Sequence, residues 1–145
     1  MSKLILETKD VTECFFDGAR LLGIMAPVKD YLFCWKLNNV LGVDFRLNNE
    51  IEIQLKRKNR DYFFGVYEYC ESTRTLEHYM YNNQFDGEYL LPEFKHLDFL
   101  WLMKGDTISD EIIREKTNNL RNIGGVQLVV ELSCERIKNK DHLVF

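Results

Sequence analysis

The chain has 145 residues, of which 46% are hydrophobic and 29% are charged, and its formal net charge at pH 7 is −4. This length suits one domain with its own core, and the ordinary hydrophobic content argues against intrinsic disorder. The negative charge argues against a general nucleic-acid binder, because such proteins present a basic surface to phosphates. We therefore expect a single domain that spans residues 1–145.

The N-terminus and the cysteine spacing bear on compartment and cofactors. The first ten residues, MSKLILETKD, contain too short an apolar run for a signal peptide, and no stretch approaches the ~20 apolar residues of a membrane span. We expect a cytoplasmic protein. The four cysteines are widely scattered, and no group of histidines and cysteines has the spacing of a zinc site. The sequence thus predicts free thiols, no metal and no cofactor.

The first third of the chain predicts two strands and a helix. Leu4–Thr8 and Arg20–Met25 have the composition of short strands, and Val28–Leu41 has helical periodicity. Two apolar stripes run along this helix, one formed by Val28, Tyr31, Leu32 and Trp35, the other by Phe33, Leu37, Val40 and Leu41. A helix that is apolar over most of its circumference is deeply buried or covered by a partner.

The middle of the chain predicts an antiparallel meander. Ile51–Lys56 alternates apolar and polar residues, as a half-buried strand does. Tyr62–Tyr69 is aromatic and favours a strand, and Leu76–Tyr81 returns after a turn. The connection Lys56–Asp61 is short and charged.

The last third predicts a β-α-β unit. Leu97–Met103 is almost wholly apolar and reads as a strand buried on both faces, and Val126–Leu132 reads as a second strand. The helix between them carries one apolar stripe, and its crossover should place the two strands parallel. The predicted fold class is α+β: a single mixed, mostly antiparallel sheet, with two helices on one face and a C-terminal β-α-β unit.

The stretch Leu91–Phe99 (LPEFKHLDF) is the most distinctive part of the sequence, because it places polar residues just before the most apolar strand. Pro92 cannot donate to a sheet ladder, so we expect it at a strand start or edge. Glu93 and Asp98 could serve acid–base chemistry or hold a cation. No surrounding pattern fixes a reaction, so we favour a structural role in which both accept hydrogen bonds. Ligand binding and catalysis are the alternatives.

This stretch resembles the motif of the IPExxxVDY proteins. Leu91 to Glu93 stand at the IPE positions and Leu97 to Phe99 at the VDY positions, where Phe99 lacks the hydroxyl of the tyrosine. The runs VKDYLFCWKLNNVL, GVYEY, LMKGD and HLVF also look like this family, so the resemblance covers most of the chain. It implies a small cytoplasmic protein of the Bacteroidetes lineage, from a family without an established biochemical function.

Two groups of residues are candidates for partner contacts. The first is the basic connection of the meander, which carries Lys56, Arg57, Lys58 and Arg60. It could meet a phosphate or an acidic partner, or form a solvated turn. The second group is the tyrosines of the meander, of which we single out Tyr67, Tyr69, Tyr79 and Tyr81. Two helices can cover only one sheet face, so we expect an open face rich in tyrosine, which is a common interface composition.

The leading hypothesis from the sequence is a non-catalytic protein-interaction or structural domain that can self-associate, as a homodimer or with another protein. The second hypothesis is a regulatory module for a small ligand, which predicts a concave pocket near Gly105–Ser109 or Glu93–Asp98. The third is an RNA-binding sheet, which needs the basic connection and exposed aromatic rings on the same side. The absence of a catalytic motif argues against an enzyme without excluding one.

Overall fold

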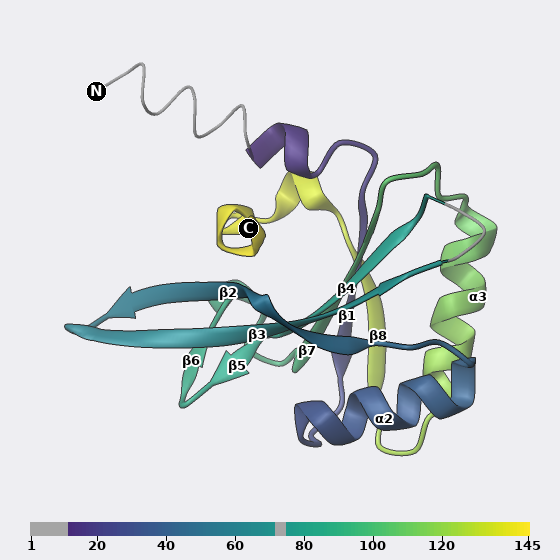
Figure 1. Ribbon diagram of the computed structural model, residues 1–145, viewed down its shortest axis with the longest axis horizontal. Coiled ribbons are helices and arrows are strands. Elements are labelled where there is room, and N and C mark those ends of the chain that lie inside the picture. Colours follow the sequence, from purple (N-terminus) through teal and green to yellow (C-terminus); the bar gives the residue numbers. More distant parts are fainter. Residues whose placement is uncertain (1–11, 72–74) are drawn as a thin grey trace.

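The computed structural model describes residues 12–71 and 75–145, so the predicted strand Leu4–Thr8 lies outside the described residues. A six-stranded sheet with the order β2-β3-β4-β7-β1-β8 forms the centre of the molecule (Figure 1). Every pair of neighbouring strands in it is antiparallel. The strands are β1 (Arg20–Met25), β2 (Arg46–Arg57), β3 (Arg60–Cys70), β4 (Glu77–Asn82), β7 (Phe99–Lys104) and β8 (Leu128–Leu132).

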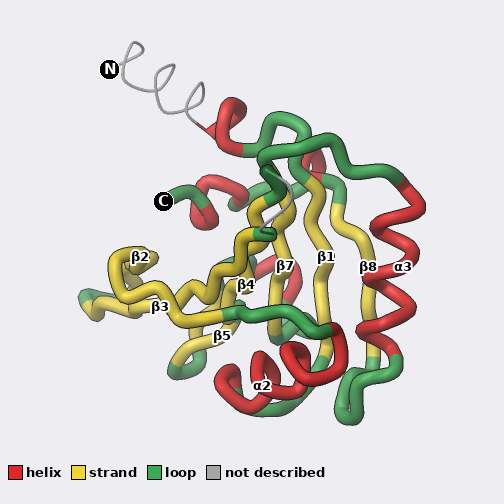
Figure 2. The backbone as a smooth tube through the Cα atoms, turned by 45° about the vertical axis from the view of Figure 1, so that its right-hand side comes forward, coloured by secondary structure: helices red, strands yellow, loops and turns green. Residues whose placement is uncertain are grey.

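Two α-helices, α2 (Asp30–Leu41) and α3 (Asp110–Arg121), pack on one face of this sheet (Figure 2). A small hairpin joins β5 (Gln84–Phe85) to β6 (Glu88–Tyr89). The described residues also contain a turn of α-helix at 12–15 and three short 3₁₀-helices: η1 (Pro92–Phe94), η2 (Cys134–Arg136) and η3 (Lys140–Leu143). The predicted α+β class, with two helices on one face, is confirmed, but the sheet is antiparallel throughout where a mixed, mostly antiparallel one was expected.

The C-terminal β-α-β unit differs from its prediction in one respect. β7 and β8 run in the same direction, as predicted, but they do not pair with each other. β1 lies between them and is antiparallel to both. The connection from β7 through α3 to β8 therefore skips one strand position in the sheet, which β1 occupies. The β1 sequence RLLGIM suits that position, because it is apolar on both sides and buried on both.

Helix α2 is rotated relative to the simplest expectation from its sequence. Its buried side consists of Phe33, Cys34 and Leu37, which belong mainly to the second predicted stripe. Tyr31 and Trp35, from the first stripe, face outward. The helix ends where predicted, because Gly42 adopts a left-handed conformation (φ 66°) and its N–H donates to the carbonyl of Asn38.

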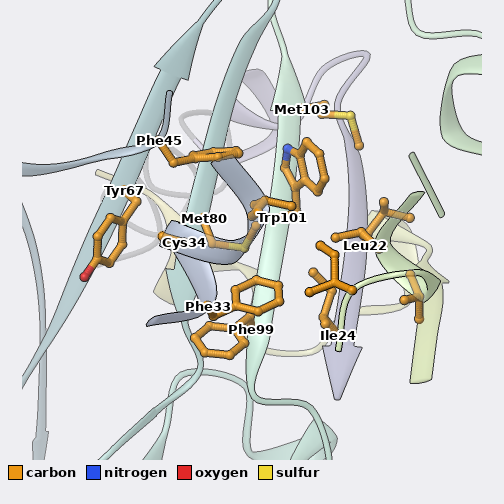
Figure 3. Packing of buried hydrophobic residues seen from close by; sticks show 14 of the residues in the cluster. Leu22, Ile24, Phe33, Cys34, Phe45, Tyr67, Met80, Phe99, Trp101 and Met103 are labelled. Atoms are coloured by element: carbon orange, nitrogen blue, oxygen red, sulfur yellow. The ribbon is translucent and has the colours of Figure 1, made fainter. Parts of the chain in front are cut away.

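The helix-side core is a continuous apolar cluster between the sheet and the two helices (Figure 3). Phe33 of α2 stacks on Phe99 of β7 with ring centroids 4.3 Å apart. Trp101 lies at the centre of β7 and is fully buried, and its Nε1–H donates to Nδ1 of His78 at 3.0 Å. Because Nδ1 accepts this hydrogen bond, the proton of the neutral ring is on Nε2, which lies 2.9 Å from Glu71 Oε1.

The opposite face of the sheet is covered by short segments, among them residues 12–16, which are α-helical over 12–15 and place Phe16 in the core. The segment after β8, residues 133–145, crosses this face; we name it the C-terminal strap (Figure 1). Ile137 and Leu143 of the strap are buried, and Phe145 packs edge-on against Tyr79 with ring centroids 4.9 Å apart. The hydroxyl of Tyr81 donates to the carbonyl of Leu143 at 2.8 Å. The expected open tyrosine face is therefore wrong, because the strap covers it.

A single glycine shows how closely the segments on this face approach the sheet. A Cβ at Gly23 of β1 would come too close to a methyl carbon of Leu97, which is itself fully buried. Leu97 precedes β7 and lies on the strap side with Leu132 of β8. A larger residue at Gly23 would force this leucine to shift, because the chain before β7 packs directly on the backbone of β1.

Candidate interaction surfaces

The motif region is organised by Asn83, which is fully buried between β4 and β5. Its side-chain amide donates to the carbonyls of Phe94 (3.1 Å) and Leu97 (2.8 Å). Its Oδ1 accepts from the N–H of Leu91 at 2.9 Å. One side chain thus satisfies three backbone groups of the LPEFKHLDF stretch and fixes its bend. The sequence gives no sign of this role, because two adjacent asparagines such as Asn82 and Asn83 are also common in ordinary turns.

The two acidic residues of the motif both accept hydrogen bonds from the chain. Asp98 Oδ2 accepts from the N–H of Ala26 at 2.8 Å, just after β1 ends. The carboxylate of Glu93 accepts from both the backbone and the side chain of Asn139 in the C-terminal strap, the latter at 2.6 Å. Asp98 therefore joins β7 to β1, and Glu93 holds the strap. These contacts are those of a structural joint.

Pro92 was predicted at a strand start or edge, but it is the first residue of η1. This position suits proline, because the first residues of a helical turn need no N–H donor and proline has the required φ. The carbonyl before it, from Leu91, accepts from the N–H of Phe94 at 2.9 Å. The motif is thus a turn of 3₁₀-helix that leads into β7.

The basic residues of the meander lie at the tip of the β2–β3 hairpin, which projects beyond the rest of the sheet (Figure 1). Lys58 and Asn59 form its turn and both have positive φ, as a two-residue hairpin turn requires. Arg60 pairs with Asp86 of the neighbouring hairpin and lies over the ring of Tyr62. Lys56 and Lys58 are exposed to solvent. The tip is therefore a small basic surface.

The four candidate tyrosines do not form one surface. Tyr79 and Tyr81 lie under the C-terminal strap, whereas Tyr67 and Tyr69 lie on the helix side. The hydroxyl of Tyr67 donates to Asp30 of α2 at 3.0 Å. Burial raises the pKa of Tyr81 well above its usual value and raises that of Tyr79 to about 12. Three of these rings are buried, so they cannot stack on RNA bases or meet a partner directly.

The largest exposed aromatic surface is on α2 instead. Trp35 is 63% exposed and Tyr31 is 62% exposed, and the two residues lie one helical turn apart on the same side. Leu32 beside them is 38% exposed. We call Tyr31, Leu32 and Trp35 the α2 outer patch. The sequence contained its signal, since the helix is apolar on more sides than one core can bury, but not which stripe would face outward.

Shallow hollows lie near both places where a ligand pocket was expected. One, of about 570 Å³, is lined by Asp17 and Gly18 and by residues 105–108. The other, of about 690 Å³, lies between the start of α2 (residues 27–30) and the β5–β6 hairpin, with Asp98 in its lining. Among residues 12–71 and 75–145, no group of three or more histidine, cysteine or acidic side chains could hold a metal ion.

Comparison with known proteins gives no family for the chain. No protein-family model matches it, and no curated protein matches it. In the described part of the chain, no helix has the length and apolar character needed to cross a membrane. A function for this chain must therefore be inferred from its own residues.

Proposed function

We propose that this domain is a non-catalytic protein-interaction module that self-associates through the α2 outer patch. The observation that supports this most directly is the exposure of Trp35 and Tyr31 on one side of a helix whose other side is buried. Tryptophan and tyrosine dominate the binding energy of protein interfaces. A monomeric protein has little reason to keep both in water, because each presents about 150–250 Å² of surface.

A second copy of the chain suits this patch in charge and in geometry. Its three residues carry no charge, so two copies can face each other without like-charge contacts. Tyr31 and Trp35 are four residues apart, so two antiparallel α2 helices related by a two-fold axis would place each Tyr31 near the Trp35 of the other copy. Such an isologous contact uses the same patch twice and closes as a dimer.

The area of the patch determines how strongly two copies of the chain are expected to associate. The exposed parts of the three side chains amount to roughly 350 Å² per copy. Two copies would bury about 700 Å², which is less than the ~1,200 Å² at the low end of stable complexes. We therefore expect a weak dimer that forms at high protein concentration. Salt should strengthen it modestly, because it screens the repulsion between two chains of charge −4.

Size-exclusion chromatography with light scattering over a concentration series tests the proposal. The wild-type mass should rise from monomer toward dimer, and Trp35→Ser should stay monomeric throughout. Phe63→Ser is the matched control, since Phe63 is 42% exposed but is a residue of β3 and not of the patch, and it should behave as wild type. A wild type that is monomeric at the highest concentration, or a Trp35→Ser chain that associates equally well, would contradict the proposal.

A ligand-binding role is the second candidate, and the hollow beside Asp98 favours it. Its lining combines the first residues of α2 with Asp86 and Phe85 of the hairpin, so a small polar molecule could meet both backbone and carboxylate groups. A thermal-shift screen of small metabolites tests this role. A hit that raises the melting temperature and is lost in Phe85→Ala would support it, and a screen without hits would count against it.

We also propose that the chain belongs with the IPExxxVDY proteins and works in the cytoplasm. The motif positions coincide with the joint held by Asn83, Glu93 and Asp98, which gives the motif a structural reason. The four free thiols suit a reducing compartment. Sequences with the motif should then keep an asparagine at the position of Asn83, and an unrelated set of residues there would contradict the assignment.

A further inference from the structure

The two edges of the six-stranded sheet differ in how they are protected from other strands. β2, at one edge, carries alternating charges and has a register shift between Leu47 and Glu52. Both features discourage pairing with a second chain. β8, at the other edge, reads LVVEL and has no proline, no glycine and one charged residue, Glu131. Within the described residues no strand pairs with its outer side, so β8 is an open edge.

The register of the sheet shows which groups of β8 face outward. β1 directs the carbonyl of Ile24 toward β7, so its alternate residues, such as Gly23, hydrogen-bond to β8. Gly23 is opposite Val130. The alternation of an antiparallel ladder then leaves the N–H and C=O of Val129 and Glu131 directed to the open side. These groups can accept one more strand.

A hollow continues this edge beyond the end of β8. It has a volume of about 510 Å³ and is lined by Phe16, by residues 18–20 and by residues 131–135. Phe16, Ala19 and Cys134 supply apolar surface in its lining, and Glu131 and Glu135 supply carboxylates. An extended peptide that pairs with β8 could place one side chain here. Strand addition gains its specificity from such side-chain sites.

The charges around the edge favour a basic partner over a second copy. Arg20 bonds both carboxylate oxygens of Glu131 (2.8 and 2.9 Å) and also pairs with Asp110 at 2.8 Å. One guanidinium therefore faces two carboxylates, and Glu135 adds a third nearby. Pairing of two β8 strands would bring two such acidic groups together, which is unfavourable. A lysine or arginine in the added strand would balance the excess negative charge.

We propose that the open edge of β8 binds an extended, apolar segment of a partner protein whose lysine or arginine side chain enters the hollow beside Glu131 and Glu135. The segment would add to the sheet as a seventh strand through the N–H and C=O groups of Val129 and Glu131. This surface is separate from the α2 outer patch, so it remains free in a dimer formed through α2.

Peptide titration of the full chain, followed by amide NMR, tests this proposal. The probes are two capped peptides of about seven residues, the length of an ordinary strand. One alternates valine with lysine and the other alternates valine with glutamate. The lysine peptide should shift the amides of Val129 and Glu131 and bind at least about tenfold more tightly than the glutamate peptide. A third probe, the lysine peptide N-methylated on alternate residues, should not bind, because it cannot complete the ladder.

Two variants at one position separate the backbone contribution from the charge. Glu131→Ala and Glu131→Pro both remove the carboxylate, but only proline removes the outward N–H, and an edge strand tolerates it there. The lysine peptide should bind Glu131→Ala several-fold more weakly than wild type and should not bind Glu131→Pro. Trp35→Ser should bind the peptide as wild type does, so a failure of self-association leaves this test intact.

Three results would overturn the proposal. The first is the absence of amide shifts at β8 with either peptide. The second is equal binding of the N-methylated probe, which needs no folded variant to interpret. The third is protection of the Val129 and Glu131 amides in the free chain that increases with protein concentration, since a second copy would then occupy the edge.

Discussion

The two faces of the central sheet are both buried, but by different kinds of structure. On one face, α2 and α3 lay regular apolar stripes over Trp101 and Phe99. On the other face, the C-terminal strap and the motif before β7 cover the strands with irregular chain. The first face depends on apolar packing between elements that form by periodicity. The second depends on single polar side chains, such as Asn83, which hold the backbone of irregular segments in place. These segments form few backbone hydrogen bonds of their own.

The two faces therefore differ in how well the sequence predicts the contacts that stabilise them. Apolar periodicity marks the helix side in advance, because a buried stripe must repeat along a helix. A strap has no period, so its position is set by a few specific hydrogen bonds and by the buried groups they satisfy. Mutations should therefore act differently on the two faces, and the predictions below run from the largest expected effect to the smallest.

Phe33→Ala removes a fully buried ring that stacks on Phe99, so we expect a loss of about 3–5 kcal/mol in the free energy of unfolding. Urea denaturation monitored by circular dichroism measures it. Trp35→Ala, on the outer side of the same helix, should change the free energy of unfolding by less than about 0.5 kcal/mol. Equal losses for the two variants would show that α2 presents a different side to the core.

Asn83→Ala leaves two carbonyls and one N–H of the motif without their partner, so we expect a loss of about 3 kcal/mol, from about 1–3 kcal/mol for each buried group. The same urea measurement applies. Asn39→Ala, an exposed asparagine that also bonds a carbonyl, is the control and should cost less than about 0.5 kcal/mol. A stable Asn83→Ala chain would mean that the motif holds its bend without Asn83.

Asp98→Ala removes the acceptor for the N–H of Ala26 at the junction of β1 and β7. We expect a loss of about 1–3 kcal/mol, as for one hydrogen bond to a charged group, and a lower melting temperature by calorimetry. Asp98→Asn keeps an acceptor and should recover part of the loss. An unchanged melting temperature for Asp98→Ala would reject the structural role of the motif and favour the ligand site beside it.

Alkaline pH should weaken the strap face through its buried tyrosines. Tyr79 and Tyr81 have raised pKa values in the folded chain, because burial disfavours the phenolate. Their contribution to stability is therefore complete below the unfolded pKa of about 10 and is lost as pH rises toward 12. Thermal melts from pH 8 to beyond pH 11 measure this, with tyrosinate absorbance recorded in parallel.

Tyr81→Phe isolates one of these residues. It removes the bond to the Leu143 carbonyl, so it should cost about 1 kcal/mol at neutral pH. It should also reduce the alkaline loss, because phenylalanine does not ionise. Identical alkaline curves for wild type and Tyr81→Phe would show that the strap does not bury Tyr81 in solution.

Much of the fold could be predicted from the sequence, and the reasons are visible in particular residues. Arg20–Met25 is a strand with the predicted bounds, and α2 ends at Leu41, as predicted. The insertion of β1 between β7 and β8 could not be predicted, because strand order is set by long-range pairing and not by local pattern. The strap was missed for a related reason, since Leu143 and Ile137 show no periodicity.

The candidate surfaces were less predictable than the fold. The tyrosines of the meander were assigned to one open face, but alternate residues of a strand point to opposite faces, which separates Tyr67 from Tyr79 and Tyr81. The patch on α2 was visible only as an excess of apolar residues. The side of α2 that is exposed depends on where β2 and β7 lie in the fold, because Phe33 and Trp35 are equally suited to a core.

Dilution of the wild-type chain, followed by NMR, tests self-association through the α2 outer patch most directly. The chain has two tryptophans, so its spectrum contains two indole N–H signals. The signal of Trp35 should move with protein concentration, together with the backbone amides of α2. The signal of Trp101 should stay fixed, because it is buried and bonded to His78. Concentration-dependent shifts confined to another surface, or none at all, would contradict the account.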